Sequence, residues 1–462
     1  RHCNRNDGAR ATMTDTTTPP YVRTRLSVMM FLQYAIWGAW LPILYPFLLG
    51  HRGFELSEVG LILAGGAAGA IVGPFIAGQI ADRFFATEKF LGVSHLVGAV
   101  LVWFLAEQDS YVPFLVISIF YGIVYAPTLA LTNSISFHHL PDRDRDFGKV
   151  RLWGTMGWIA AGIMMGQWLL ANHTPTDADA AAVQAAQDAG RADAFKLSAI
   201  LGVVMGIFCF MLPHTPPATE AKSNASLKAL VEVKRQPLLM LFIIAIPVSI
   251  IHQFYFVHTT DFLSVIQRSV ANDPVGQAID RVFGVGGSGL MTIGQMCEVA
   301  VIGLMPFVAK KVGRKWLLAA GLVAYALRMA LFAYLPTDTA AGLAMAITGV
   351  ALHGFCFGCF IFVAFMVVDE QTTPDVRASA QNLFNLVIVG IGIIVGSMFA
   401  TKIAEMNTFI DTDGNQQMDY TGLFTVPMWM AVGCLALLLV AYPARAKKIE
   451  PVVNTETDGV IA

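Results

Sequence analysis

One carboxylate stands inside an apolar stretch that is long enough to cross a lipid bilayer. Glu298 lies in the middle of the run 286–310, and Gln295 precedes it by three residues, so both belong to one face of a helix. An ionised acid at the centre of a membrane costs about 2.5–3.5 kcal/mol on insertion scales. We therefore expect Glu298 to face a cavity or a partner and to present, with Gln295, a carboxyl group and an amide to one ligand. A structural hydrogen bond between helices is the alternative.

A second polar stripe runs along the apolar segment 150–172. Arg151, Thr155 and Trp158 recur at the spacing of one helical face. They combine a cation, a hydroxyl group and an aromatic ring, which would suit a polar ligand that contains a ring. Since Arg151 lies near the end of its segment, an anchor at the membrane interface is the alternative for that residue.

Further polar groups within apolar segments are harder to assign. Gln253 stands beside Phe254, Tyr255 and Phe256, and this group offers amide and stacking contacts, although aromatic residues in membrane helices more often serve in packing. Arg328 lies deep in the segment 315–335 and is expected to pair with an acid or with backbone carbonyl groups. Four histidines in apolar segments are possible proton carriers, but we favour structural roles for them: His95, His252, His258 and His353.

The chain as a whole has the composition of a membrane protein. Hydrophobic residues make up 56% and charged residues 13%, whereas soluble domains carry about 25% charged residues. A formal net charge of −2 leaves no basic excess for nucleic acid. Apolar segments of the length of a bilayer are predicted at 24–50, 58–82, 88–107, 111–137, 150–172, 194–213, 236–262, 286–310, 315–335, 340–368, 378–404 and 422–444.

These segments predict an all-α polytopic membrane protein with twelve transmembrane helices in two six-helix halves. Lys and Arg concentrate in alternate loops, which places both termini in the cytoplasm and the chain in the cell (inner) membrane. The predicted organisation is a disordered segment 1–22, a half 23–213, a linker 214–235, a half 236–446 and a tail 447–462. Residues 173–193 form a polar outer loop in this interpretation.

An internal repeat supports the division into halves. Pro74-Phe75-Ile76-Ala77 is echoed by Pro306-Phe307-Val308-Ala309, and each opens a loop between neighbouring segments. Repeated halves are typical of transporters that bind substrate near the midplane. In the first loop, Gly78, Asp82 and Arg83 resemble the loop motif of the major facilitator superfamily, and 310–315 is its degenerate counterpart. A glycine permits close helix approach, and an aspartate beside a helix end accepts orphan amides, so we expect contacts that change between transport states.

Enzymatic chemistry finds no support in the sequence. There is no P-loop, no metal-spaced His/Glu motif and no G-x-S-x-G nucleophile elbow. The pair Cys356 and Cys359 lies within an apolar run and lacks the context of a redox motif. We therefore expect no enzyme activity, no metal and no cofactor.

Several runs coincide with one family. They are Phe31-Leu32-Gln33-Tyr34-Ala35-Ile36-Trp37-Gly38-Ala39-Trp40-Leu41, Tyr125-Ala126-Pro127-Thr128-Leu129, Arg151-Leu152-Trp153-Gly154-Thr155, Leu327-Arg328-Met329-Ala330-Leu331-Phe332-Ala333-Tyr334 and Arg377-Ala378-Ser379-Ala380-Gln381. In this order the chain resembles the nucleoside:proton symporter family of the major facilitator superfamily. The resemblance implies the major facilitator fold and a nucleoside site in which Arg151, Thr155, Gln253, Gln295 and Glu298 match the family's polar positions.

The chain departs from the family pattern at three positions. Trp158 stands where the family has a phenylalanine, Phe256 where it has an asparagine, and Gly358 where the tenth helix carries an aspartate. Our hypothesis is proton-coupled nucleoside uptake by alternating access, with a substrate site that includes Trp158 and Phe256. Glu298, aided by Arg151, would carry the proton.

Two alternatives remain open. A proton-coupled transporter of sugars or other small polar solutes would explain the missing acid and amide. A solute sensor that does not transport is the second. If Glu298 is not the coupling residue, His95, His353 or a different driving ion takes its place.

Overall fold

Helices dominate the computed structural model, which describes residues 20–76, 85–217, 230–373, 376–412 and 416–443. The first half contains α1 (Pro20–Trp40) with its continuations η1 (Leu41–Ile43), α2 (Leu44–Pro46) and η2 (Phe47–His51), then α3 (Leu56–Ile76), α5 (Thr87–Glu107), α6 (Tyr111–His139), α7 (Arg143–Asn172), α8 (Ala180–Gly190) and α9 (Ala192–Cys209). All its members except α8 build six long helical segments, as the sequence predicts.

The second half repeats this plan with two interrupted helices. It contains α11 (Leu238–Ser269), α12 (Pro274–Phe283), α13 (Ser288–Val308), α14 (Arg314–Tyr334), the tenth segment α15 (Ala340–Ala351), α16 (His353–Phe355), η4 (Cys356–Phe362) and α17 (Val363–Glu370), the eleventh segment α18 (Arg377–Asn385), η5 (Leu386–Ile391) and α19 (Gly392–Met406), the hairpin strands β1 (Thr408–Ile410) and β2 (Gln416–Met418), and α20 (Tyr420–Ala441). Both interruptions, η4 and η5, are π-helical turns.

Length and hydropathy agree with a polytopic membrane protein. Within the described residues, ten helical segments are long and apolar enough to span a bilayer. α3 and α7 complete the pattern of long segments: the apolar stretch counted in α3, Leu56–Ala67, is shorter than a span, and α7 falls below the hydropathy criterion. For α7 the reason lies in the glycine, tryptophan and glutamine residues of its apolar part, because the stretch beyond its charged first turns is itself only moderately apolar. The predicted membrane fold is therefore confirmed, with ten of its spans identified by hydropathy.

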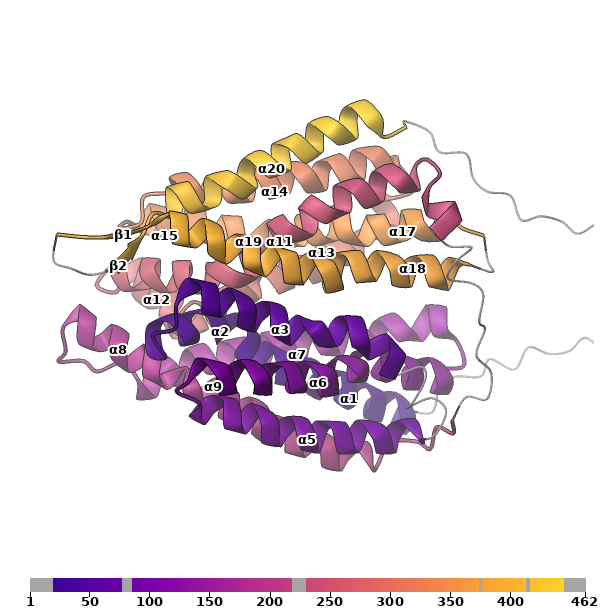
Figure 1. Ribbon diagram of the computed structural model, residues 1–462, viewed down its shortest axis with the longest axis horizontal. Helices are drawn as coiled ribbons and strands as arrows, with labels where there is room; N and C mark the ends of the chain where they lie inside the picture. The colour runs from indigo at the N-terminus through magenta and orange to yellow at the C-terminus, as the bar shows by residue number, and fades with distance from the viewer. Residues whose placement is uncertain (1–19, 77–84, 218–229, 374–375, 413–415, 444–462) are drawn as a thin grey trace, which may run out of the picture.

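The two halves lie side by side as separate bundles (Figure 1). α8, α12 and the β1–β2 hairpin lie at one end of the molecule, at the left of Figure 1, and we call this the hairpin end. The described chain begins at Pro20 and ends at Pro443 at the opposite end, which we call the terminal end. Six-helix halves joined in this way are the architecture of alternating-access transporters.

Close helix contacts within the first half depend on glycine. α1 packs on α7, α3 on α6 and α5 on α9. At Gly69 of α3 a Cβ atom would lie 1.9 Å from the carbonyl oxygen of Gly122, so that α3 and α6 touch backbone to backbone. Small residues drive helix association in lipid in this way, because apolar side chains gain little from leaving an apolar solvent.

Several hydrogen bonds between the halves lie at the hairpin end, while α3 also packs along α19 and η5. The amide of Val285 donates to the carbonyl of Gly166 over 3.1 Å, and the Gln167 side chain donates to the carbonyl of Arg281 over 3.0 Å. The hydroxyl of Ser288 donates to the carbonyl of Gly162 over 3.3 Å. These bonds join α7 of the first half to α12, to the segment after it and to the start of α13, so the structure is closed at the hairpin end.

Three details differ from the sequence prediction. α1 begins at Pro20, so the last residues of the segment predicted as disordered, 1–22, are helical. The predicted loop 173–193 contains α8, whose first turn is capped by the carboxylate of Asp179. The polar stretch before α13 contains α12, which has Asp273 as its N-cap and Pro274 in its first turn. Short amphipathic helices of this kind lack the long apolar run that reveals a membrane helix.

Candidate functional site

Glu298 faces a histidine on a neighbouring helix. It lies on α13, one turn after Gln295, and its Oε2 is 3.6 Å from Nε2 of His353 on α16. The side chain of His353 is 1% exposed and that of Glu298 is 18% exposed. The carboxyl group therefore reaches the edge of an accessible space while the imidazole is enclosed by protein. Glu298, which was expected to face a cavity or a partner, therefore has a polar neighbour inside the bundle.

Aromatic rings enclose His353 on both faces. Tyr255 stacks on it with ring centroids 4.7 Å apart and an angle of 15°, and His252 stacks at 5.3 Å and 27°. Nδ1 of His252 shares a hydrogen bond of 2.8 Å with the hydroxyl of Tyr325. The ring of His353 is thus held in one orientation, with Nε2 toward Glu298.

Arg328 completes this cluster from α14. Its Nη1 donates to Nδ1 of His353 over 3.2 Å, and its guanidinium lies 4.4 Å from the ring centre of Tyr255 and 5.0 Å from that of Tyr325. The side chain is fully buried, and its Nε and Nη2 have no hydrogen-bond partner among the described residues. Arg328 therefore rests on aromatic faces and an imidazole. The structure shows no acid bound to it in the described part of the chain.

The first half contributes Arg151 and Trp158 from α7. The guanidinium of Arg151 lies 4.0 Å from the ring centre of Tyr34, and Arg151 is close enough to Glu298 for their charges to interact. Trp158 packs edge to face on Trp37, with centroids 5.7 Å apart, and its ring meets Phe256 of the second half at 6.5 Å. Trp158 and Phe256 thus form an aromatic contact between the two halves.

The two glutamines of the predicted site differ in their bonding. Gln253 donates to the hydroxyl of Ser397 over 2.9 Å, so its amide nitrogen is occupied within the second half. Gln295 is buried, and its Oε1 has no hydrogen-bond partner among the residues that the structure describes. A buried acceptor without a partner costs about 1–3 kcal/mol, which a donating ligand would recover. Thr155, one turn before Trp158, is half-buried.

The structure thus brings Arg151, Glu298, Trp158 and Phe256 toward the contact between the halves, with Gln295 on the same helix as Glu298. Gln253 lies on α11 with Phe256, but its known bond points to α19. Sequence reasoning missed the role of His353 as the neighbour of Glu298. It also expected an acid or carbonyl partner for Arg328, whereas the structure shows imidazole and ring faces. The only signal in the sequence was that both side chains are polar groups in apolar segments.

Gly358 has no room for the acid that the family resemblance implies at that position. A Cβ atom at Gly358 would lie 2.6 Å from Cγ1 of Val301 on α13. An aspartate there would require the side chain of Val301 or the turn η4 to shift. With glycine in place of the family's aspartate, the tenth segment therefore packs closely against α13, the helix that carries Glu298.

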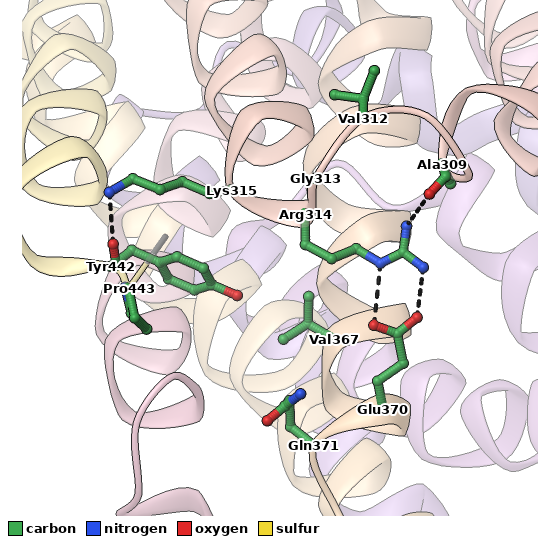
Figure 2. Close-up of a pocket in the computed structure, with 10 residues that line it drawn as sticks. All are labelled: Ala309, Val312, Gly313, Arg314, Lys315, Val367, Glu370, Gln371, Tyr442 and Pro443. Carbon is green, nitrogen blue, oxygen red and sulfur yellow. Dashed lines mark hydrogen bonds and ion pairs between the residues drawn. The ribbon is translucent and has the colours of Figure 1, made fainter. Parts of the chain in front are cut away.

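The predicted loop motif is only partly described. Gly78, Asp82 and Arg83 fall in 77–84 and lie outside the described residues. In the counterpart 310–315, Arg314 donates to both carboxylate oxygens of Glu370, over 3.1 and 2.5 Å, and so ties the α13–α14 loop to the end of α17 (Figure 2).

A cavity of about 300 Å³ lies beside this ion pair (Figure 2). Lys315 enters its lining, but its ammonium group donates to the carbonyl of Tyr442 over 2.6 Å. The charges around the cavity are thus bound to other groups of the protein. It lies at the terminal end of the second half, apart from Glu298, and we assign it a structural role.

The two helical halves have the major facilitator fold of membrane transporters. The solved structure of the nucleoside transporter NupG matches with a TM-score of 0.75 at 24% identity and covers 90% of this chain and 98% of that chain. The D-xylose–proton symporter matches with a TM-score of 0.64 at 15% identity, over 93% of this chain and 100% of the other. At these identities the likeness concerns the fold.

The chain belongs to the nucleoside H+ symporter family, whose model matches residues 21–447. The putative nucleoside transporter YegT of Escherichia coli (strain K12) is 30% identical over 90% of this chain and 93% of that protein. The nucleoside permease NupG of the same organism is 26% identical over 84% and 89%. The xanthosine permease of that strain is 27% identical over 82% and 87%. The family consists of transporters, as expected from the lack of catalytic motifs.

Proposed function

We propose that this protein imports nucleosides together with protons by alternating access. The observation that carries the proposal is Glu298, a carboxyl group set deep in the bundle beside the contact between the halves, in a chain that belongs to the nucleoside H+ symporter family. A polar group at that depth is expensive in a membrane unless it serves a pathway.

Each side chain near Glu298 has a proposed role in binding. The nucleobase stacks against Trp158 and contacts Phe256, whose rings meet edge to face across the halves, so that binding couples the two halves mechanically. Gln295 accepts a hydrogen bond from the nucleoside through its free Oε1. Arg151, Thr155 and Gln253 bind the remaining polar groups of base and ribose, and Gln253 exchanges its bond to Ser397 for one to the substrate.

Glu298 carries the proton in this proposal. When it is ionised, its attraction to Arg151 holds the halves in one arrangement. Protonation removes that attraction and, together with bound nucleoside, permits the halves to reorient. An electrochemical gradient supplies the free energy, and no cofactor is needed.

The orientation follows from the distribution of Lys and Arg. The terminal end, with both termini, faces the cytoplasm, and the hairpin end faces outward across the cell (inner) membrane. The structure is then closed toward the outside, and the linker 214–235 tethers the halves 23–213 and 236–446. Contacts of Gly78, Asp82 and Arg83 are proposed to change as the cytoplasmic ends of the helices separate.

The second candidate function is transport of a sugar or another small polar solute. It remains open because this chain has Phe256 and Gly358 at positions where the family carries an amide and an acid. Counterflow in proteoliposomes distinguishes the two. Vesicles loaded with unlabelled uridine, adenosine, xanthosine, xylose or maltose are diluted into a trace of the same labelled solute. We expect transient accumulation with nucleosides alone. Counterflow with a sugar alone would support the second candidate, and its absence with every solute would indicate a sensor.

A further inference from the structure

The contacts of His353 assign the position of its ring proton. Arginine only donates hydrogen bonds, so the contact of 3.2 Å from Arg328 Nη1 makes Nδ1 of His353 an acceptor. A neutral imidazole with an accepting Nδ1 carries its proton on Nε2. That nitrogen is the one that faces Glu298 Oε2 at 3.6 Å. The Nε2–H group of His353 therefore points at the carboxylate.

We propose that His353 is the residue through which Glu298 receives the transported proton, and that Arg328 gates this transfer by occupying Nδ1. The inference rests on the proposed function and adds a proton path to it. In the structure, which is closed at the hairpin end, the lone pair of Nδ1 is engaged and His353 cannot take a second proton. The path to Glu298 through His353 is blocked in this state.

The transfer balances as a relay. When Arg328 moves off, Nδ1 accepts a proton from a hydronium ion, which leaves a water molecule, and Nε2 releases its own proton to Oε2 of Glu298. The imidazole remains neutral with its proton on Nδ1, and Glu298 becomes a neutral carboxylic acid, so that one proton has moved. Return of Arg328 to the ring requires the ring to exchange protons with water: Nδ1 releases its proton and Nε2 takes up another, which restores the original tautomer with no net change in charge. No co-reactant other than the proton is consumed.

Close packing of α16 against α13 holds His353 beside Glu298. A Cβ atom at Gly354, next to His353, would lie 2.5 Å from the backbone carbon of Cys297, next to Glu298. A Cβ atom at Gly294 would lie 3.0 Å from Cβ of His353. These two glycines let α16 touch α13. Because 3.6 Å is slightly longer than a hydrogen bond, a small slide of one helix against the other makes or breaks the relay.

Within the described part of the chain, the titratable groups around His353 and Glu298 include no second carboxylate. The groups packed around this pair are His252 and Tyr255 on α11, Tyr325 and Arg328 on α14, Cys297 on α13 and Cys356 in η4, with Arg151 facing Glu298 from the first half. His252 already shares its Nδ1 bond with Tyr325. Among the described residues, Glu298 is the acid in contact with His353.

The test compares His353→Gln with His95→Gln in proteoliposomes. Glutamine keeps an amide donor and acceptor but does not relay a proton. His95 is a matched control, since it is buried in the first half with Nδ1 on the carbonyl of Leu91. Labelled uridine is followed in two assays. Counterflow without a gradient reports binding and reorientation, and accumulation driven by an imposed pH gradient reports coupling.

We expect His353→Gln to keep uridine counterflow but to lose accumulation above equilibrium, with a flattened dependence of uptake on pH. His95→Gln should resemble the wild type in both assays. The double variant His353→Gln/Glu298→Gln should lose no more coupling than either of its single variants, because both residues act in one path. Wild-type accumulation with an unchanged pH profile in His353→Gln would overturn the relay, and so would loss of counterflow, which indicates a structural role. Wild-type protein without uridine counterflow would overturn the proposed function and the relay with it.

Discussion

Cation–π contacts with tyrosine rings stabilise two arginines, Arg328 and Arg151, at the centre of this protein. Arg328 is fully buried, yet its guanidinium lies over Tyr255 and Tyr325 and donates to His353. A desolvated cation over an aromatic face gains about 2 kcal/mol or more, so two faces offset part of the cost of burial. Arg151 rests on Tyr34 in the same manner. Neither cation forms an ion pair with an acid among the described residues, so both remain available to respond to Glu298 and His353.

Trp158 is the residue whose loss should affect substrate binding most simply. Stacking of a base on an aromatic side chain contributes about 1–3 kcal/mol, so Trp158→Ala should raise the KM for uridine about tenfold with a smaller change in kcat. Trp153→Ala is the matched control, because Trp153 lies on the same helix and is 50% exposed. Initial rates of uptake against uridine concentration give the comparison. Equal KM values for the two variants would show that Trp158 does not touch the substrate.

At the scale of elements, the tenth segment positions the site by departing from a regular helix. α16 and the π-helical turn η4 follow α15, and glycines at 354 and 358 bring this stretch against α13. Single π-turns within helices are frequent at functional sites because they re-aim side chains. Here the departure sets His353 over Glu298 and leaves no space at Gly358 for a side chain.

The α12 element predicts a measurable pH dependence of stability. Burial raises the pKa of Asp280 to about 6, although Gln267 donates to its carboxylate over 2.7 Å. The folded protein thus binds this proton more tightly than the unfolded chain does. The resulting stability is complete at low pH and is lost as the pH rises through about 6. Asp280→Asn should therefore match the wild-type Tm near pH 4 and exceed it near pH 7.5, as measured in detergent.

Asp273→Asn serves as the control for this experiment. It removes an acid from the same helix but keeps the N-cap bond to Val275, since asparagine caps as well as aspartate does. Its Tm should follow the wild-type curve at every pH. Parallel curves for Asp280→Asn and the wild type would contradict the assignment of the pH dependence to Asp280.

The sequence predicted the elements better than their mutual orientation. Apolar length located all the long segments, and the cost of a buried charge singled out Glu298. Hydropathy along one helix does not reveal which residue of another helix it meets, so the contact of Glu298 with His353 could not be derived. The same limit applied to Arg328, whose aromatic neighbours come from α11 and from its own helix. The sequence analysis did not predict α8 and α12, because short helices in polar loops lack the long apolar run that identifies a membrane helix.

At the scale of the whole molecule, the two halves are joined by hydrogen bonds at the hairpin end, and the structure is closed there. Arg191 extends the contacts there, because its Nη2 donates to the hydroxyl of Ser264 on α11 over 3.2 Å. Bonds of this kind must break when the transporter opens to the hairpin side. The structure therefore represents one of the two states that alternating access requires.

Cysteine labelling tests the proposed orientation. On a cysteine-free background, Ala180→Cys at the exposed start of α8 should react with an impermeant maleimide on intact cells. Ala225→Cys, in the predicted linker, should react only after permeabilisation. The loop distribution of Lys and Arg is the reason for this expectation. The reverse pattern would place the termini outside and would invert the assignment of the closed end.

The central claim is that a proton gradient drives nucleoside uptake through Glu298. The direct measurement is accumulation of labelled uridine in proteoliposomes with an alkaline interior, with and without a protonophore. Wild-type protein should concentrate uridine and lose that ability when the protonophore is added. Glu298→Gln keeps the shape and hydrogen bonding of the side chain but cannot ionise, so it should retain uridine exchange without concentrating it. Concentration of uridine by Glu298→Gln to the wild-type level, or by the wild type regardless of the protonophore, would contradict the account.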